Sequence, residues 1–307
     1  MVRASFCVVL FLITAGGASG QGMPGAIHID GERSMVPLTQ RLTEWYHHNN
    51  QATSFEVSGS GPTPAIQSLV DGKADVVQSA RQVLGGEITA LRERRGKKFL
   101  QVPVAIEVAG ILIHPSNPVQ QLSIFDLRQI LSGAVKNWKQ VGGKDAPIKI
   151  YGRDNSSDVR DFIEAEYLGD ASISSSAKTF PKNSLLYAAV AADPDAIGYA
   201  TVNLSLNPKV RFMAIKTSAS APAVAPTTEN IAAHKYPLVR QLYYIFAGQP
   251  SGELQKFAEW VFSQQGQLVV EAAELWPLDS TERDRGKTQL AGRQSSHLTN
   301  VAALPPL

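Results

Sequence analysis

The chain has almost no cysteine. Its only one among 307 residues, Cys7, lies inside a short apolar run near the N-terminus, residues 6–13. Arg3 precedes this run and the small residues at 18–20 follow it, which is the pattern of a secretory signal peptide. A buried strand is the other interpretation, and the run is too short to span a bilayer permanently. We expect residues 1–20 to be a cleaved export signal, leaving a mature chain with no thiol and no disulfide.

The chain also lacks an excess of charge of either sign. It carries 29 Lys and Arg against 27 Asp and Glu, a net charge of +2, and 18% of its residues are charged while 44% are hydrophobic. This composition is that of an ordinary globular protein, and 307 residues are enough for two domains. No overall field attracts polyanions, so we expect no nucleic-acid partner, and any anion must be recognised at a local site.

Signals for metal binding and catalysis are missing as well. His47 and His48 are adjacent on an expected helix and point to different faces, and the other histidines are isolated, unlike the closely spaced ligands of zinc sites. The sequence contains neither a Gly-x-Ser-x-Gly elbow nor a glycine-rich phosphate loop. We therefore expect no metal, no cofactor and no enzymatic activity.

Short β-rich stretches alternate with helical patterns from residue 27 onward, which favours an α/β fold with mainly parallel sheets. The expected strands are 26–30, 55–61, 74–80, 148–153 and 196–202. Helices are expected after Pro37, before Gly72 and over 124–131, and the apolar spacing of 236–275 predicts a helical block. Ligands of such sheets bind outside the carboxyl ends of the strands.

A long run of β-branched residues, 103–114, is too long for a strand of one lobe and suits a crossing between two lobes. The chain is expected to cross back within 203–216. The predicted organisation is lobe I from 26–105 plus 214–279, lobe II from 106–213, and a disordered tail from 280–307, because that last stretch is polar and has no periodic pattern. Two such lobes form a cleft that can close by hinge motion.

Residues 151–162 read YGRDNSSDVRDF and pass from a strand into a helix. Arg153 and the two serines 156 and 157 precede the first helical turn, whose backbone N–H groups have no internal partner and attract anions. Asp158 stands in the same turn, where an ionised carboxylate ~4 Å from an anion costs roughly 4 kcal/mol. It either caps the helix, accepts the proton of a protonated oxyanion, or marks a change of ligand.

Several stretches match one known family in order along nearly all of the mature chain. They are DGERSMVPL (30–38), VSGSG (57–61), AIQSLVDGKADVVQSARQVL (65–84), HPSNPV (114–119), LSIFDLRQILSGAVKNWKQVGG (122–143), YGRDNSSDVRDF (151–162), DAIGYATV (195–202), YPLVRQLYYIF (236–246) and SQQGQLVVEAAELWPL (263–278). With these stretches the chain resembles the phosphate-binding proteins of Pst-type ABC importers, which belong to the type II periplasmic-binding-protein superfamily.

The resemblance implies a two-lobed α/β fold in which each lobe is a mainly parallel sheet flanked by helices. It also implies a non-catalytic, monomeric receptor, periplasmic or secreted, that captures inorganic phosphate between the lobes and delivers it to an ABC permease in the inner membrane. In that family an acidic acceptor takes the proton of phosphate and rejects sulfate. The alternatives are another oxyanion, such as sulfate, molybdate or a phosphonate, and an interaction protein without transport on the same scaffold.

The same resemblance assigns the ligand-binding residues. They are Ser34 and Met35 in the first turn, Ser60 and Gly61 in the second, Ser79 and Arg81 after the third strand, and Arg153, Ser156, Ser157 and Asp158 in the opening of the later helix. The chain departs from the family at Glu32, at the prolines that follow Gly61, and at Asp158 and Val159, where the family has glycine and threonine. Arg81 has a rival role as the ion-pair partner of Glu87 or Glu107.

Overall fold

The structure is a computed structural model that describes residues 25–95, 99–154, 157–202 and 209–292. The expected export signal, residues 1–20, lies outside these ranges, as do Ser156 and the end of the expected tail. Among the helices of the described ranges, none is long and apolar enough to cross a membrane.

Strands and helices alternate along the described chain. The strands are β1 (Ile27–Gly31), β2 (Phe55–Val57), β3 (Val76–Ser79), β4 (Leu100–Ile113), β5 (Gln121–Ser123), β6 (Lys149–Arg153), β7 (Lys178–Phe180), β8 (Ala196–Thr201), β9 (Arg211–Phe212), β10 (Ala214–Lys216) and β11 (Val239–Phe246). The α-helices are α1 (Val36–Asn49), α2 (Pro62–Asp71), α3 (Gly85–Arg95), α4 (Ile124–Leu131), α5 (Asp158–Ile163), α6 (Asn183–Ala191), α7 (Thr228–Ala232), α8 (Gly252–Val261), α9 (Gln264–Ala272) and α10 (Ser280–Leu290). Shorter helical turns are η1 (Arg33–Met35), η2 (Trp138–Val141) and η3 (Glu164–Leu168).

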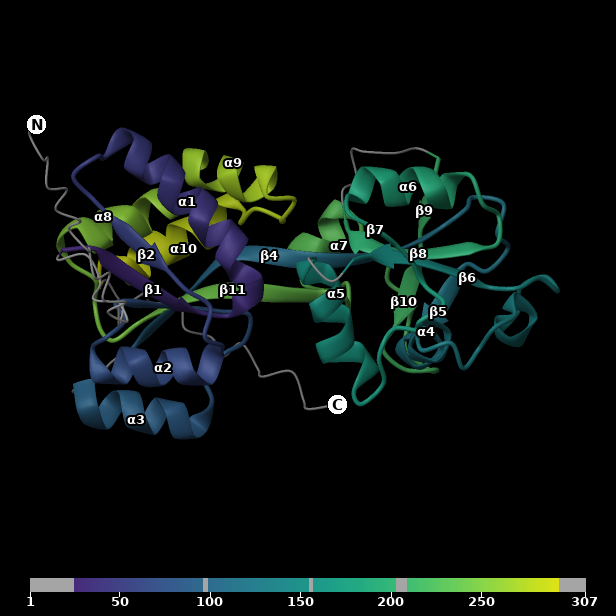
Figure 1. The fold of residues 1–307 in the computed structure, drawn as a ribbon, viewed down its shortest axis with the longest axis horizontal. Coiled ribbons are helices and arrows are strands. Elements are labelled where there is room, and N and C mark those ends of the chain that lie inside the picture. Colours follow the sequence, from purple (N-terminus) through teal and green to yellow (C-terminus); the bar gives the residue numbers. More distant parts are fainter. Residues whose placement is uncertain (1–24, 96–98, 155–156, 203–208, 293–307) are drawn as a thin grey trace, which may run out of the picture.

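One sheet runs through the whole molecule in the order β2-β1-β3-β11-β4-β8-β6-β7, with β9 paired to β4. The outer strands on each side are parallel to their neighbours, whereas β11 and β4 are antiparallel to the strands beside them. Figure 1 shows two bodies side by side, with β4 and β11 extending from one toward the other and helices on both faces of the sheet. The predicted α/β architecture, with a sheet flanked by helices in each of two bodies, is confirmed.

The central strand β11 corrects one prediction, because residues 239–246 fall inside the block that was expected to be helical. The segment is rich in aromatic and β-branched residues, and its last five residues are all buried. It pairs with β3 on one side and β4 on the other. A strand buried on both faces is apolar in a continuous run, so its apolar residues also fit a helical spacing. The two helices α8 and α9 form the rest of that block.

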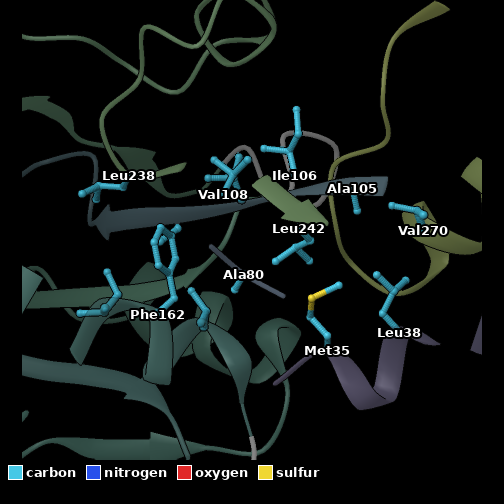
Figure 2. Packing of buried hydrophobic residues seen from close by; sticks show 14 of the residues in the cluster. Met35, Leu38, Ala80, Ala105, Ile106, Val108, Phe162, Leu238, Leu242 and Val270 are labelled. Carbon is cyan, nitrogen blue, oxygen red and sulfur yellow. The ribbon is translucent and has the colours of Figure 1, made fainter. Parts of the chain in front are cut away.

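The main core follows β4 and β11 from one body to the other. Leu38 of α1 and Val270 of α9 pack beside Ala105 at one end of the cluster, and Phe162 of α5 packs near Val108 at the other (Figure 2). The predicted crossing run, 103–114, lies within β4, whose residues are almost all buried. The strand that links the two bodies is therefore itself part of the core, which positions α1 and η1 opposite α5.

The division of the chain into two lobes remains a proposal. Lobe I was expected to take up the chain again at residue 214, but β10 begins there and pairs with β5, whose residues belong to the expected lobe II. The pairing of β10 with β5, and of Ile215 with Val224, favours a boundary later in the chain than residue 214.

The prediction of a disordered tail is wrong for residues 280–290, which form α10. Asp279 caps this helix by accepting a hydrogen bond from the backbone N–H of Glu282 over 2.8 Å, and the Asp279 N–H donates to the Glu282 carboxylate over 3.1 Å. Leu290 and Gly286 are buried, and a Cβ at Gly286 would lie 2.2 Å from the Phe262 ring. The capping box and one close helix contact order a segment whose polar composition shows no apolar stripe.

Replacing the cap tests whether α10 contributes to stability. We expect Asp279→Ala to lower the free energy of unfolding by about 1 kcal/mol, because the first turn loses its side-chain acceptor. Urea unfolding followed by circular dichroism measures the change, with the exposed residue Asp284→Ala in the same helix as the control. Equal stability of the two variants would show that the cap contributes nothing.

Candidate functional site

The first predicted turn follows β1 and forms η1. Ser34 lies in η1, which contacts α5 on the other side of the central strands. The Ser34 hydroxyl is buried and has no hydrogen-bond partner in the described chain. The Met35 side chain is buried in the core, and its N–H donates to the Glu32 carbonyl over 3.1 Å. Of these two predicted donors, the Ser34 hydroxyl is the one left available to a ligand.

The second predicted turn is bound to a carboxylate of the chain itself. Asp30, in β1, accepts hydrogen bonds from the Ser60 N–H over 2.9 Å, from the Ser60 hydroxyl over 2.6 Å and from the Ser58 hydroxyl over 2.8 Å. Burial raises the pKa of Asp30, but these bonds outweigh it and hold the pKa below its usual value. The Gly61 N–H donates to the Gly31 carbonyl over 2.8 Å. Ser60 and Gly61 therefore hold the turn against β1, with all three of these donors already engaged.

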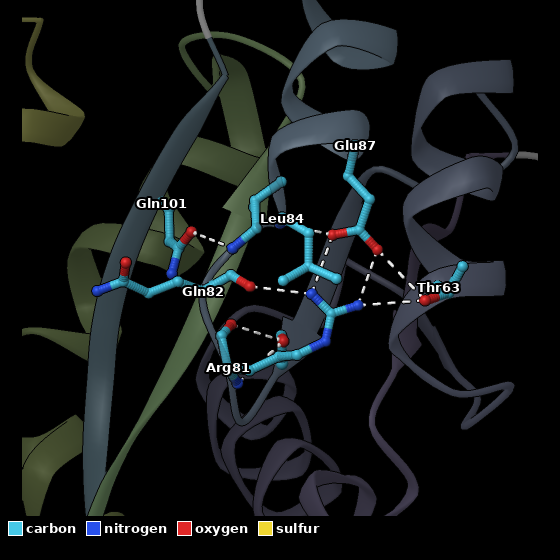
Figure 3. Close-up of polar contacts among 8 residues, drawn as sticks. Thr63, Arg81, Gln82, Leu84, Glu87 and Gln101 are labelled. Carbon is cyan, nitrogen blue, oxygen red and sulfur yellow. Dashed lines mark hydrogen bonds and ion pairs between the residues drawn. The ribbon is translucent and has the colours of Figure 1, made fainter. Parts of the chain in front are cut away.

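The third predicted position, after β3, is also engaged. Arg81 donates to both carboxylate oxygens of Glu87, over 2.9 and 2.7 Å, and to the Thr63 hydroxyl over 3.2 Å (Figure 3). The bond to Glu87 raises the pKa of Arg81, and the same bond lowers the pKa of Glu87. The buried Ser79 hydroxyl donates to the Arg81 carbonyl over 2.8 Å. Of the two carboxylates considered for Arg81, the structure pairs it with Glu87.

Arg153 ends β6 and lies on the α5 side of the molecule. Its guanidinium donates to the Phe180 carbonyl over 3.2 Å, to the Pro181 carbonyl over 3.0 Å and to the Asn183 side chain over 2.9 Å. These bonds hold the guanidinium at the start of α6. Arg153 is still close enough to Asp158 to oppose the rise of that group's pKa.

Asp158 is the first residue of α5, and its carboxyl is largely buried. The N-cap is Ser157, which is buried and whose side chain makes no capping bond, so the interpretation of Asp158 as the helix cap is wrong. Burial raises the pKa of Asp158 to about 7, and the nearby carboxylates Glu107 and Asp161 add to the rise. At neutral pH the group is therefore poised between a proton donor and a proton acceptor. Ser156, the last predicted residue, lies outside the described ranges.

A buried ion pair at the crossing strands escaped the sequence reasoning. Glu107 in β4 and Arg240 in β11 stand opposite each other, and the Arg240 Nε donates to a Glu107 oxygen over 2.7 Å. The two side chains are only 2% and 11% exposed. The Arg240 guanidinium also lies over the Phe162 ring of α5, 4.6 Å from its centre. Burial raises the pKa of Glu107, although Arg240 opposes the rise.

The signal for this pair was present in the sequence. Glu107 is the one charged residue of the run PVAIEVAGILI, and Arg240 is the one charged residue of YPLVRQLYYIF. A charge inside an apolar strand is costly unless it is paired, so two such runs predict that their charges meet. The pair was missed because residues 239–246 were assigned to a helical block, so that no strand carrying Arg240 was expected beside β4.

The structure thus groups the predicted residues unequally. It brings Ser34 of η1 to the same region as Asp158 of α5, beside the pair of β4 and β11. It leaves the donors of Ser60, Gly61, Ser79 and Arg81 bound to other groups of the protein. The contacting elements η1 and α5 and the crossing strands beside them carry an unpartnered hydroxyl, a titratable carboxyl and a buried guanidinium, which are the kinds of group that bind a protonated oxyanion in proteins.

A sheet of two halves joined by long central strands, with turns of both halves facing one another, defines a protein of the periplasmic-binding-protein class. The chain belongs to the PBP superfamily domain family, whose model matches residues 15–265. The predicted resemblance to the phosphate-binding proteins of Pst-type importers is confirmed by its relatives.

Two of these relatives show how far the similarity extends. The phosphate-binding protein PstS of Bacillus subtilis (strain 168) is 24% identical over 249 residues, which cover 80% of this chain and 78% of the relative. PstS of Staphylococcus saprophyticus is 26% identical over 289 residues, covering 90% of this chain and 88% of the relative.

Solved structures agree on the fold. A possible phosphate binding protein from Planctomyces limnophilus DSM 3776 superposes with a TM-score of 0.79 at 23% identity, over 87% of this chain and 98% of that one. An ABC-type phosphate transport receptor from Vibrio cholerae superposes with a TM-score of 0.63 at 25% identity, over 81% of this chain and 99% of that one.

Proposed function

We propose that the protein is an exported solute-binding protein that captures inorganic phosphate between its two lobes and delivers it to an ABC permease, without catalysing a reaction. The observation that carries the proposal is the Ser34 hydroxyl, buried without a partner in the described residues on η1, which contacts α5, in a chain whose relatives are phosphate-binding proteins over most of their length. A buried hydroxyl without a partner costs about 1–3 kcal/mol, a cost that a bound ligand removes.

Asp158 supplies the selectivity in this proposal. A carboxylate beside the site accepts a hydrogen bond from protonated phosphate, whereas sulfate has no proton to donate at neutral pH. Its burial near Glu107 keeps its pKa at about 7, so a shared proton is held between the carboxyl and the ligand. Arg153 at the end of β6 offsets part of the negative charge. Export and delivery to a permease follow the family likeness.

Calorimetric titration tests the proposal. At pH 8 we expect the mature protein to bind one phosphate and to bind sulfate far more weakly. Ser34→Ala should weaken phosphate binding about tenfold, because the ligand loses one hydroxyl partner in a buried site. Ser251→Ala, at the exposed N-cap of α8, where the side chain makes no capping bond, is the matched control and should bind as the unaltered protein does. Absence of binding to either anion would refute the proposal.

A second function has one specific observation in its favour. Asp30 and Glu87 already bind the donors of the second and third turns, so many of the predicted ligand-binding groups have partners within the protein itself. A protein that keeps the scaffold but interacts with another macromolecule instead of a transported anion would tolerate this arrangement. Calorimetry that is silent with both phosphate and sulfate would favour this second function.

A further inference from the structure

Arg240 has a buried donor that the fold does not use. Its Nε binds Glu107, but its Nη2 is buried and has no hydrogen-bond partner in the described chain. A buried charged donor normally finds its partners, because leaving one unpaired costs more than an ordinary lost hydrogen bond. The strand pairing, the ion pair and the contact with Phe162 together hold the guanidinium in one place. A fixed cation with a free N–H group is a preorganised anion contact.

The position of Arg240 coincides with the region of the proposed site. Its charge acts on Asp158 and Asp161, which lie in the first turn of α5. The charge of Glu32, two residues before Ser34, contributes to the raised pKa of Glu107, the partner of Arg240. Figure 2 shows the same meeting point from its apolar side, with Met35 of η1 and Phe162 of α5 both packed against the central strands. The unpartnered Nη2 belongs to a side chain that lies over Phe162 of α5, and the unpartnered Ser34 hydroxyl belongs to η1, which also contacts α5.

Arg81, the predicted cation of the same half, is arranged differently. Both of its terminal nitrogens donate to Glu87, and it also reaches the Thr63 hydroxyl and the Gln82 carbonyl. To bind a ligand it would have to break a two-bond ion pair. Arg240 shares only its Nε with a carboxylate and needs no rearrangement.

We propose that Arg240 binds the ligand directly, with Nη2 donating to an oxygen of the oxyanion next to the Ser34 hydroxyl, and that Glu107 holds the guanidinium in position. This inference rests on the proposed binding function and adds a contact at the crossing strands. The arginine and its carboxylate then belong to the strands that link the two bodies, so the ligand is bound where both bodies meet. Glu107 also limits affinity, because its charge offsets that of the arginine.

Calorimetry with inorganic phosphate at pH 8 tests the contact with two variants, of which one should bind phosphate more tightly and the other more weakly. Glu107→Gln keeps an oxygen that can accept the Arg240 bond but removes its negative charge, so phosphate should bind about tenfold more tightly. The double variant Glu107→Gln/Arg240→Gln has no buried charge left unpaired, and should bind about 10- to 100-fold more weakly than the unaltered protein. A role confined to stability does not produce the gain from Glu107→Gln.

The control removes an ion pair elsewhere. Lys149 and Asp193 form one over 2.9 Å, with the lysine side chain 47% exposed, and Lys149→Gln/Asp193→Asn should leave phosphate affinity unchanged. Unaltered protein that does not bind phosphate would overturn the proposed function and this inference together. Unaltered protein that binds phosphate, with a double variant that binds equally well, would overturn the inference alone. If the double variant does not fold, Glu107→Gln decides: tighter binding supports the contact, and equal or weaker binding overturns it.

Discussion

Sulfate and phosphate should bind with similar affinity at pH 5.5, and above pH 7 sulfate binding should fall by about tenfold per pH unit relative to phosphate. The cause is Asp158, whose pKa burial and the neighbouring carboxylates raise to about 7. Below that pH the carboxyl is protonated and donates a hydrogen bond to either anion. Above it the carboxylate can only accept, and monohydrogen phosphate supplies the proton that sulfate lacks. Competition calorimetry at half-unit intervals from pH 5.5 to 8.5 measures the ratio.

Asp158→Asn separates this account from a general effect of pH. The amide donates at every pH, so the variant should bind sulfate equally well at pH 5.5 and 8.5. Asp161→Asn is the control, because Asp161 is an exposed carboxylate in the same helix that only adds to the rise of the Asp158 pKa. It should shift the midpoint to lower pH and keep the dependence. A ratio that does not change with pH in the unaltered protein would refute the acceptor role.

The same shift carries a cost in stability whose sign is fixed. A carboxyl whose pKa is higher in the folded state than in the unfolded chain binds more protons when folded, so it lowers stability as pH rises from about 4 to 7. Asp158→Asn should therefore stabilise the protein most above pH 7. A native carboxyl that lowers the stability of the fold, as Asp158 does here, is typical of a group kept for function.

The local patterns of the sequence were sufficient to predict most of the fold. The helix 124–131 was expected at the limits that α4 has, and in the structure Ser123 and Asp126 form a capping box at its start. The strand over 103–114 was expected because the run is rich in β-branched residues, and its length indicated a crossing between the two lobes. These features depend on residues near one another in the chain. The strand β11 was missed because its burial between β3 and β4 depends on partners that are distant in the sequence.

The candidate site was less predictable for the same reason. The family resemblance assigned Ser34 and Asp158, which the structure brings to one region. Position could not show that Asp30 and Glu87 bind the donors of Ser60 and Arg81, since each of those bonds depends on how a side chain is turned. The pair of Glu107 and Arg240 spans more than a hundred residues of sequence, and it becomes visible only when β11 is placed beside β4.

Removing Arg240 alone should destabilise the protein by about 3–5 kcal/mol at pH 8, because Glu107 is left as a buried charge without a partner. We expect Arg240→Met to show this loss in urea unfolding followed by tryptophan fluorescence. Burial raises the pKa of Glu107 and Arg240 opposes the rise, so the variant's Glu107 takes up its proton at still higher pH. Protonation removes the buried charge, and the loss of stability should become smaller as pH falls toward 5.

Two further variants make the test specific. Arg240→Met/Glu107→Gln carries no buried charge and should recover most of the stability at pH 8, whereas additive losses would show that the carboxylate is not the cause. Lys256→Met removes an exposed ion pair with Glu253 and should leave the free energy of unfolding nearly unchanged at either pH, because water screens such a pair. Because the same pair orients the proposed phosphate contact, recovery of stability without recovery of phosphate affinity would separate the two roles of Arg240: the fold needs the two charges balanced, and the ligand needs the guanidinium itself.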